Sequence, residues 1–412
     1  MQRSSDRILV SHAGVLPRPA ELQALADSYP AGKAAFQEML PRAVADVVRR
    51  QADMGIDLVN DGEFSKTRGF SEYVRDRLTG LGQGAREHKR LNIMARDAQD
   101  FPSFVGSKFA RFLHSPNRGA IITCISPIGY AGSQATRADI ANLKTAVEGL
   151  DVTGYLPAIA PGTIEHWLAD EHYADAEAFV FAIADAMAQE YKAVVDAGFL
   201  LQIDDPDLPD GWQMFPEMSV PQYRKYAALR VEALNHALRG IPQEKVRLHI
   251  CWGSNHGPHK NDIPFEDIVD LMLRVKAGCY SFEFSNPRHE HEWRVWETHK
   301  LPEGKTIMPG VVGHATDIIE HPQLVADRLV LFANLVGREN VVAGTDCGLA
   351  SRLSHPELTW AKLEALVEGA RLASKALWRA KTKTATTKAA KKPARRSAKT
   401  RARRLAASGR QR

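Results

Sequence analysis

The sequence predicts an α/β protein of the (β/α)8 TIM barrel class, and three observations support this. Strand-like and helix-like stretches alternate along most of the 412 residues, as in parallel strands joined by helical crossovers. Eight such units remain when a long excursion after the second strand is set aside, which is the number that closes a barrel. Chemistry-bearing side chains fall at the C-terminal ends of the predicted strands, where barrels build their sites: His12, Glu63, Asp204, His249, Cys251, Glu283, His314 and Cys347.

An open, doubly wound sheet is the alternative fold. It is weakened because no G-x-G-x-x-G motif follows the first predicted strand. We therefore expect the strands to close into a barrel.

The eight predicted strands share short apolar runs, many of them β-branched, that end in turn or polar residues. In chain order they are residues 7–14, 56–63, 155–162, 199–207, 246–253, 280–286, 306–313 and 340–348. The predicted helices between and after them show apolar residues at helical spacing, and Asp175 is placed as an N-cap. These helices are residues 33–55, 135–149, 175–198, 220–239, 265–278, 290–299, 322–336 and 356–378.

Residues 64–150 are less regular than the rest. They contain a basic, turn-rich segment ("GAREHKRLNIMARD"), an apolar strand ("GAIITCISP") and the helical stretch 135–149. We interpret this segment as an excursion between barrel strands and not as a separate domain. The predicted organisation is one barrel domain over residues 1–380, followed by a tail.

The tail, residues 381–412, has a composition of its own. It carries 13 Lys or Arg and no acid, which leaves 41 basic against 49 acidic residues, a net of −8, in the remainder. A low-complexity Lys/Arg/Ala/Thr sequence without an apolar face predicts disorder. Such a tail binds polyanions such as DNA non-specifically, and we expect catalysis not to need it.

The sequence also indicates in which cellular compartment the protein is expected. No apolar run approaches the length of a membrane span, and residues 1–12 lack the apolar core of a signal peptide. Four cysteines in so long a chain do not form a disulfide framework, so a reducing cytoplasm and metal-bound or buried thiols fit better. We expect a cytoplasmic protein with no membrane association.

A metal site is predicted at the end of the fifth strand. His249 and Cys251 lie two residues apart on a strand, so their side chains project to the same face. Glu283 and Cys347 end the sixth and eighth predicted strands. One imidazole, two thiols and a carboxylate form a borderline-soft set that suits tetrahedral zinc. A His and a Cys that merely fill a core strand are the alternative, but placement of all four at strand ends favours a metal.

The ordered motifs resemble those of the catalytic barrel of cobalamin-independent methionine synthase and its single-barrel relatives. They are "AGVLPRP", "NDGE", "LQIDDPDL", "HICWG", "SFEFSNP", "PGVVGHATDIIEHP" and "GTDCGLASR", spread over about residues 6–378. The combination of H-x-C, a later Glu and D-C-G-L is the specific part. The resemblance implies zinc held by His249, Cys251, Glu283 and Cys347, with the oxygen ligand Glu283 as the one that yields to an incoming thiol.

The resemblance also implies residue roles in methyl transfer. His314, in "GVVGHATD", corresponds to a proton donor, and protonation is needed because the amine of a methylfolate is a poor leaving group. Asp204 and Asp205 resemble an acid pair that contacts the ammonium of an amino acid, and Glu63 resembles a further contact. Salt bridging across the barrel mouth is the alternative for Asp205, so we favour Asp204 and Glu63 as substrate contacts.

Two departures from the family bear on the substrates. The family's first loop offers Gly-Ser to the substrate carboxylate, whereas this chain has Gly14 and Val15, so His12 or a backbone N–H would replace the hydroxyl. The full-length enzyme of the family also has two barrels with folate between them, and this chain has one. The methyl donor is then methylfolate or a methylated corrinoid carried by a partner protein.

The sequence thus predicts a zinc-dependent methyltransferase that moves a methyl group to the thiol of homocysteine and gives methionine. Alkyl transfer to another small thiol, as in epoxide opening, is an alternative within the same zinc chemistry. A metal-free enzyme of the uroporphyrinogen decarboxylase type is a second alternative. A nucleic-acid-associated protein that acts through its tail is a third.

Overall fold

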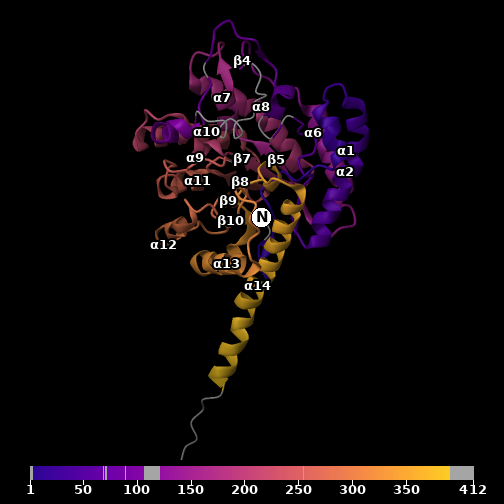
Figure 1. Ribbon diagram of the computed structural model, residues 1–412, viewed down its shortest axis with the longest axis vertical. Helices are drawn as coiled ribbons and strands as arrows, with labels where there is room; N and C mark the ends of the chain where they lie inside the picture. Colours follow the sequence, from indigo (N-terminus) through magenta and orange to yellow (C-terminus); the bar gives the residue numbers. More distant parts are fainter. Residues whose placement is uncertain are drawn as a thin grey trace, which may run out of the picture.

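A computed structural model describes residues 3–389 apart from 68, 70, 71, 89, 106–120 and 254, with side chains to Trp378. Eight strands form one parallel sheet in the order β1-β11-β10-β9-β8-β7-β5-β2, and Figure 1 shows β5, β7, β8, β9 and β10 side by side in the middle of the molecule. The strands are β1 (Leu9–Val10), β2 (Leu58–Val59), β5 (Thr153–Ile159), β7 (Leu200–Asp204), β8 (Val246–Ile250), β9 (Cys279–Phe282), β10 (Thr306–Val312) and β11 (Val342–Thr345). All eight lie within the predicted stretches or overlap them.

The two ends of this sheet meet, so the sheet curls into a nearly closed barrel. The N–H of Asp57, next to β2, donates to the carbonyl of Val10 on β1 at 3.0 Å, and the Ser11 hydroxyl donates to the carbonyl of Leu58 at 3.1 Å. With helices around the parallel strands, the fold is the predicted (β/α)8 TIM barrel. The C-terminal ends of all eight strands therefore face one mouth.

Helices follow most strands as the sequence predicts, but each of the predicted helices 265–278 and 290–299 is instead a 3-10 turn followed by a short α-helix. Stop and start signals account for several boundaries: α2 ends at Gly55 in the left-handed region (φ 93°), and the Asp175 side chain accepts a bond from the N–H of Ala178 at the start of α8. The α-helices are α1 (Ala20–Asp27), α2 (Lys33–Met54), α3 (Ala95–Asp100), α4 (Pro102–Val105), α6 (Ser133–Val147), α7 (Pro161–Trp167), α8 (Ala176–Asp196), α9 (Asp207–Met214), α10 (Val220–Ala237), α11 (Val269–Arg274), α12 (Val295–Thr298), α13 (Pro322–Val336) and α14 (Pro356–Ala389). Short 3-10 turns are η1 (Glu72–Asp76), η2 (Gln243–Lys245), η3 (Phe265–Asp267), η4 (Glu290–Arg294), η5 (Arg338–Asn340) and η6 (Leu349–Ser351).

The excursion after β2 is more structured than its sequence predicts. A second, small sheet has the order β3-β4-β6 and is built from β3 (Leu81–Gly82), β4 (Ile122–Cys124) and β6 (Leu168–Asp170). Its third strand comes from beyond the excursion, directly after α7. Helix α6 contacts α2 and α8 and is the ring helix between β2 and β5. The excursion is thus inserted between β2 and its own ring helix.

The last helix differs from its prediction in length. It runs to Ala389, beyond the expected end at residue 378 and into the segment predicted to be disordered, and Figure 1 shows it projecting from the body. Lys and Ala are good helix formers, so the composition that lacks an apolar face still permits helix. Residues 390–412 of the predicted tail lie outside the described residues. Among the described helices, none combines the length and apolarity that crossing a membrane requires.

The barrel interior below the mouth is a closed layer. Seven strands each contribute one buried side chain to it: Leu9, Leu58, Tyr155, Leu200, Cys279, Met308 and Val342. The eighth strand contributes Arg247, whose guanidinium lies 4.1 Å from the centre of the Tyr155 ring. Arg247 also donates to Gln202 at 2.7 Å, and Gln202 donates to Asp204 at 2.7 Å. This chain of hydrogen bonds fixes Asp204 at the floor of the mouth.

Candidate metal centre and substrate pocket

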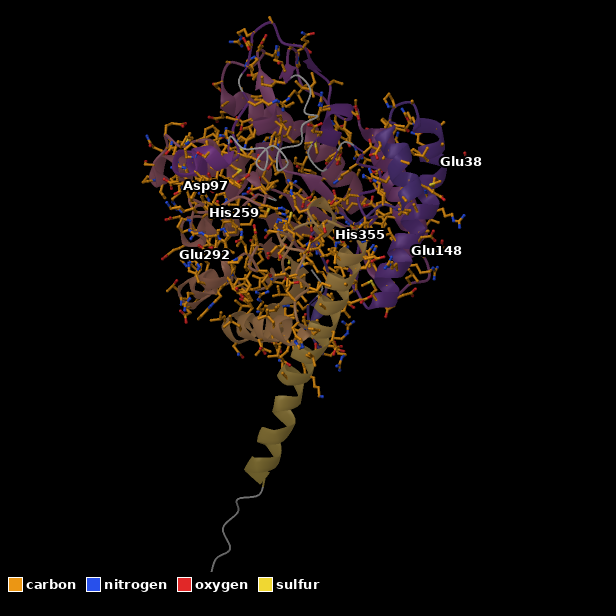
Figure 2. All side chains as sticks on the ribbon, viewed as in Figure 1. Glu38, Asp97, Glu148, His259, Glu292 and His355 are labelled. Carbon is orange, nitrogen blue, oxygen red and sulfur yellow. The ribbon has the colours of Figure 1, made fainter. Side chains whose placement is uncertain are left out.

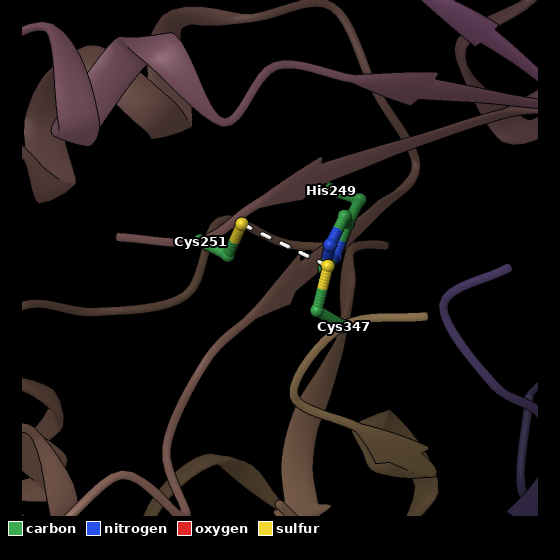
Figure 3. A group of neighbouring side chains, drawn as sticks. All are labelled: His249, Cys251 and Cys347. Carbon is green, nitrogen blue, oxygen red and sulfur yellow. Dashed lines mark hydrogen bonds between the residues drawn. The ribbon is translucent and has the colours of Figure 1, made fainter. Parts of the chain in front are cut away.

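His249, Cys251 and Cys347 come together at the barrel mouth. Their ligand atoms all lie within 4.8 Å of one another, and the two sulfurs are 3.9 Å apart. Figure 3 shows the imidazole of His249 beside the sulfur of Cys347. The strand alternation that places His249 and Cys251 on one face, and the position of Cys347 just after β11, produce this convergence.

The donor set fits a tetrahedral metal. Two sulfurs bound to one zinc at about 2.3 Å would lie roughly 3.8 Å apart, close to the observed separation. The Nδ1 of His249 lies 3.0 Å from the Ser281 hydroxyl, which orients the ring. Its Nε2 is buried and makes no hydrogen bond to any described residue, so it is available as a ligand.

The two thiols interact with each other. A hydrogen bond from Cys251 holds the pKa of the Cys347 thiol well below its usual range, although burial opposes this. The same pairing, together with burial, raises the pKa of Cys251 well above its usual range. Cys347 is the more exposed of the two.

Glu283 stands beside this cluster, not within it. Its Oε2 accepts from the N–H of Trp252 at 2.9 Å, and its Oε1 accepts from the side chain of Asn286 at 3.1 Å. It belongs to a neighbouring group with His314 and Asp346, whose ligand atoms also lie within 4.8 Å of one another. The structure thus brings three of the four predicted zinc ligands together and holds the fourth next to them by hydrogen bonds.

His314 lies deep in this neighbouring group. It follows β10, which pairs with β9 and β11, so its ring lies between Glu283 and Asp346. Both ring nitrogens are buried and bond to no described residue. Buried, unpartnered polar atoms are costly and mark functional sites more often than structural ones. His314 does not line the pocket that contains His249, Cys251 and Cys347.

A pocket opens above the metal cluster. Its lining combines the cluster, apolar side chains from the excursion and from α7, and acids that follow β2 and β7: Ala13, Val15, Glu63, Ile93, Trp167, Asp204, Pro206, Asp207, Asp210, His249, Cys251, Gly253, Cys347, Gly348, Ser351 and Arg352. A small molecule in this pocket would contact sulfur ligands and carboxylates together. The predicted contacts Glu63 and Asp204 are both in its wall.

Glu63 is held in place by its neighbours. The Lys66 ammonium lies 3.0 Å from its Oε2 and also donates to the carbonyl of Pro157. Gly14 has φ 142°, and a Cβ there would lie 2.3 Å from the Oε1 of Glu63. The predicted role of Gly14 is therefore indirect, because its missing side chain leaves the space that the carboxylate occupies.

We expect Gly14→Ala to weaken amino-acid binding by roughly tenfold or more and to lower the melting temperature. The added methyl group displaces the Glu63 carboxylate, and the backbone conformation disfavours a side chain. Gly198→Ala is the matched control, because Gly198 also has positive φ but has open space around its Cβ position. Calorimetric titration with methionine compares them, and equal loss of affinity in both variants would contradict this role.

Asp204 and Asp205 have different surroundings in the structure. Asp204 lines the pocket, and burial, together with the charge of Glu63, raises its pKa to about 7. Asp205 accepts from the Thr163 hydroxyl at 2.9 Å and does not line the pocket. Successive side chains along an extended segment point to opposite sides, so a substrate contact is favoured for Asp204 and stays an untested prediction for Asp205.

His12 is also removed from the pocket. Its ring nitrogens lie 2.9 Å from the carbonyl of Gly14 and 2.8 Å from the side-chain oxygen of Gln51. Burial lowers its pKa to about 4, so the ring is neutral. Both ring nitrogens are occupied and the ring anchors the first loop to α2, so of the two predicted replacements for the family's hydroxyl a backbone N–H is favoured over His12.

Among the pocket residues that the sequence analysis did not identify, Asp210 and Arg352 are the two whose charge bears most on a ligand. Asp210 lines the pocket with an Oδ1 that is buried and bonded to no described residue, and burial raises its pKa well above the usual range. Arg352 lines the pocket after η6, and burial lowers its pKa although the charges of Cys347 and Cys251 oppose this. Both residues lie in loops or helices that follow barrel strands, where functional side chains are expected. Neither lies on a strand itself, so strand periodicity did not identify them.

A buried ionic network fixes the loop after β8. His259 lies 2.7 Å from a carboxylate oxygen of Asp262, and the same oxygen is 3.1 Å from His289. His289 also pairs with Glu292 at 2.8 Å and stacks on Trp252, with ring centres 4.0 Å apart. Figure 2 shows His259 and Glu292 on the side of the molecule that carries α11 and α12. The His-rich segment 289–292 therefore packs this loop against the residue that follows Cys251.

We expect Asp262→Asn to lower the free energy of unfolding by about 3–5 kcal/mol at pH 7, since two buried imidazolium groups lose their shared partner. Burial alone would lower both pKa values, but the Asp262 carboxylate raises that of His259 to about 10 and that of His289 to about 9. Their stabilisation is full below the unfolded pKa near 6.5 and is lost as the pH rises through 9–10.

Urea unfolding at pH 7 and pH 10 measures this effect. The wild type should lose much of its advantage over Asp262→Asn between the two pH values, because the imidazoles of the folded protein become neutral. Asp270→Asn serves as the control, since Asp270 pairs with Arg224 at a partly exposed site. A difference between wild type and Asp262→Asn that is the same at both pH values would show that the network is not ionic.

Comparison with known proteins places the chain in a family. Residues 124–372 match the family model described as the cobalamin-independent synthase catalytic domain. The chain is 24% identical over 371 residues to the methionine synthase of Saccharolobus islandicus, covering 89% of this chain and 95% of that protein. It is 22% identical to the methionine synthase of Sulfurisphaera tokodaii, with 87% and 90% covered.

Solved structures agree on the fold. A B12-independent methionine synthase from a Shewanella species superposes with a TM-score of 0.70 at 22% identity, covering 90% of this chain and 99% of that one. A putative vitamin-B12 independent methionine synthase from Listeria monocytogenes gives a TM-score of 0.62 at 18% identity, covering 89% and 98%. With the family model matched over more than half of its length, the chain belongs to the cobalamin-independent methionine synthase family and is a methyltransferase of that kind.

Proposed function

We propose that this protein transfers a methyl group from 5-methyltetrahydrofolate to the thiol of homocysteine and gives methionine, with zinc as its metal. The observation that carries the proposal is the cluster of His249, Cys251 and Cys347 at the floor of a pocket lined by carboxylates. Soft ligands suit a metal that activates a thiol. The carboxylates suit the ammonium group of an amino-acid thiol.

His249, Cys251 and Cys347 would hold the zinc, with Glu283 as an exchangeable fourth ligand. Zinc bound there would keep the substrate thiol deprotonated at neutral pH. Glu283 is suited to exchange because Trp252 and Asn286 can hold its carboxylate beside the cluster when it is not a ligand. A catalytic site with three permanent protein ligands leaves one position open for the substrate.

The wall of the pocket would bind and orient the amino acid. Asp204, fixed by Gln202, and Glu63, fixed by Lys66, offer carboxylate oxygens to the ammonium group. Asp210 offers an oxygen that no described residue occupies. Trp167 and Ile93 supply apolar surface on which the ring of the methyl donor can pack.

His314 would protonate the departing amine of the methylfolate. Its two unpartnered nitrogens and its position behind Glu283 and Cys347 support this role. A positioned acid of this kind contributes about 10²–10⁴-fold to the rate. A methylated corrinoid is the alternative donor, and its leaving group needs no proton.

One set of assays on the zinc-loaded protein tests which thiol accepts the alkyl group and which compound donates it. Homocysteine and 2-mercaptoethanesulfonate are each combined with methyltetrahydrofolate, methylcobalamin and a small epoxide, and the alkylated thiol is measured by mass spectrometry. We expect methionine from homocysteine with methyltetrahydrofolate. Epoxide opening by 2-mercaptoethanesulfonate, without methionine formation, would instead establish the alternative thiol alkyl transfer.

A further inference from the structure

Arg352 presents an unpaired cation to the pocket. It follows η6 at the C-terminal end of β11, its Nε is fully buried, and no residue in the described part of the chain accepts a hydrogen bond from its side chain or pairs with it. A buried guanidinium nitrogen without an acceptor is costly, and the side chain as a whole is half-buried at the pocket wall. The position is therefore built for an anionic group that the protein itself does not supply.

Three carboxyl groups of the pocket, those of Asp204, Asp207 and Asp210, come from the other side of the barrel mouth, whereas Glu63 follows β2. In the strand order, β7 and β11 lie four positions apart in a ring of eight, so they face each other across the barrel. Asp204 and Asp210 follow β7, whereas Cys347 and Arg352 follow β11. A ligand above the cluster of His249, Cys251 and Cys347 would meet the carboxyl groups of Asp204 and Asp210 on one side and the guanidinium of Arg352 on the other.

The hydroxyl beside Arg352 in the pocket wall is that of Ser351, and it already donates to the carbonyl of Gly348 at 2.6 Å. Val15 lines the same wall, and a Cβ on Gly348 would lie 2.5 Å from its Cγ1, so its apolar side chain packs directly against the loop that follows Cys347. An anionic group on this side of the pocket therefore has a guanidinium to bind and an apolar neighbour. A planar, forked donor of this kind matches a carboxylate.

We propose that Arg352 binds the carboxylate of the substrate, and that the pocket selects a zwitterionic amino-acid thiol over a thiol that carries an anion alone. Arg352 is then a specificity-determining residue, and the ammonium end lies toward Asp204 and Asp210. This inference rests on the proposed function in one respect, namely that the sulfur of the ligand lies at the metal cluster. A sulfonate is the other anion that a guanidinium would accept, and the acids across the pocket argue against it.

Calorimetric titration with thioethers tests the proposal without using catalysis. Methionine is compared with 3-(methylthio)propan-1-amine, which lacks the carboxylate, and with 2-(methylthio)ethanesulfonate, which has an anion but no ammonium. Each is titrated into metal-free and zinc-loaded protein. The variants are Arg352→Met, Arg352→Lys and the control Arg371→Met, which removes an exposed arginine from α14.

We expect the wild type to bind methionine about 10- to 100-fold more tightly than either thioether, as one charge-assisted pair provides. Arg352→Met should bind methionine no more tightly than the amine that lacks the carboxylate. Arg352→Lys should retain part of the preference for methionine, and Arg371→Met should retain all of it. Zinc content should be unchanged, because Arg352 supplies no ligand.

Three results would overturn the proposal. They are an unaltered preference in Arg352→Met, no preference in the wild type, and binding of the sulfonate as tightly as methionine. A loss of zinc from Arg352→Met with the preference retained would assign the residue to the sulfur ligands instead. If the wild type shows the preference but forms no methionine in the assay, the proposed reaction fails and the role of Arg352 stands.

Discussion

Replacing Cys347 by Ser is expected to abolish zinc binding and thiol alkylation together. A neutral hydroxyl is a poor zinc ligand, whereas the thiol of Cys347 has a pKa well below its usual range because Cys251 donates a hydrogen bond to it. Removal of one of three converging ligands should weaken zinc binding by roughly 10²-fold or more. Cys251→Ser should have a similar effect, since its sulfur lies 3.9 Å from that of Cys347.

The measurement is zinc content after dialysis against a competing chelator, with alkylation activity on the same samples. Cys124→Ser is the matched control, because its sulfur donates to the carbonyl of Ser126 and a hydroxyl can do the same. Circular dichroism confirms that each variant folds. Full zinc occupancy in Cys347→Ser would remove this residue from the metal site and with it the observation that carries the proposed function.

His314→Asn is expected to slow transfer from methyltetrahydrofolate by roughly 10²-fold or more, while zinc content and thiol affinity stay near those of the wild type. Asn approximates the size of the ring but cannot deliver a proton. The substitution also breaks no hydrogen bond to any described residue, because both ring nitrogens are unpartnered. A decrease in rate is then attributable to chemistry more than to folding.

Methylcobalamin supplies the internal comparison. Its leaving group needs no proton, so the same variant should react with it almost normally, and single-turnover rates with the two donors are compared directly. Equal loss with both donors would make His314 a structural or binding residue. Unchanged rates with both would remove it from the mechanism. Asp210, which lines the pocket and whose pKa burial raises well above its usual range, would be the next acid to test.

The barrel and the convergence of His249, Cys251 and Cys347 were predictable because they depend on local periodicity. Short apolar runs ending in turn residues define the eight strands, and the two-residue spacing of His249 and Cys251 places both on one face of β8. Cys347 could be added because parallel strands bring their C-terminal ends to one mouth. These inferences need only the direction in which each side chain leaves its strand.

The extent of the excursion was not predictable in the same way. Strand β6 pairs with β4 from outside it, and α6 proves to be a ring helix by its contacts with α2 and α8. Short strands with few apolar residues become strands through their partners, and sequence alone does not reveal a partner that lies more than 40 residues away. Pairing between distant segments was decided by the tertiary structure.

The same distinction separates the site residues. The sequence by itself determined which elements carry polar side chains to the mouth, including Glu63, Asp204 and His314. Only the tertiary structure decided which polar side chains near the mouth already have hydrogen-bond partners within the protein. Asp205 bonds to Thr163 and His12 bonds to Gln51. Glu283 accepts hydrogen bonds from Trp252 and Asn286. The tertiary structure also left Arg352 without a partner. The physical reason is that a buried polar group is satisfied by whichever donor or acceptor the fold brings to it from elsewhere in the chain, and no local pattern records that contact.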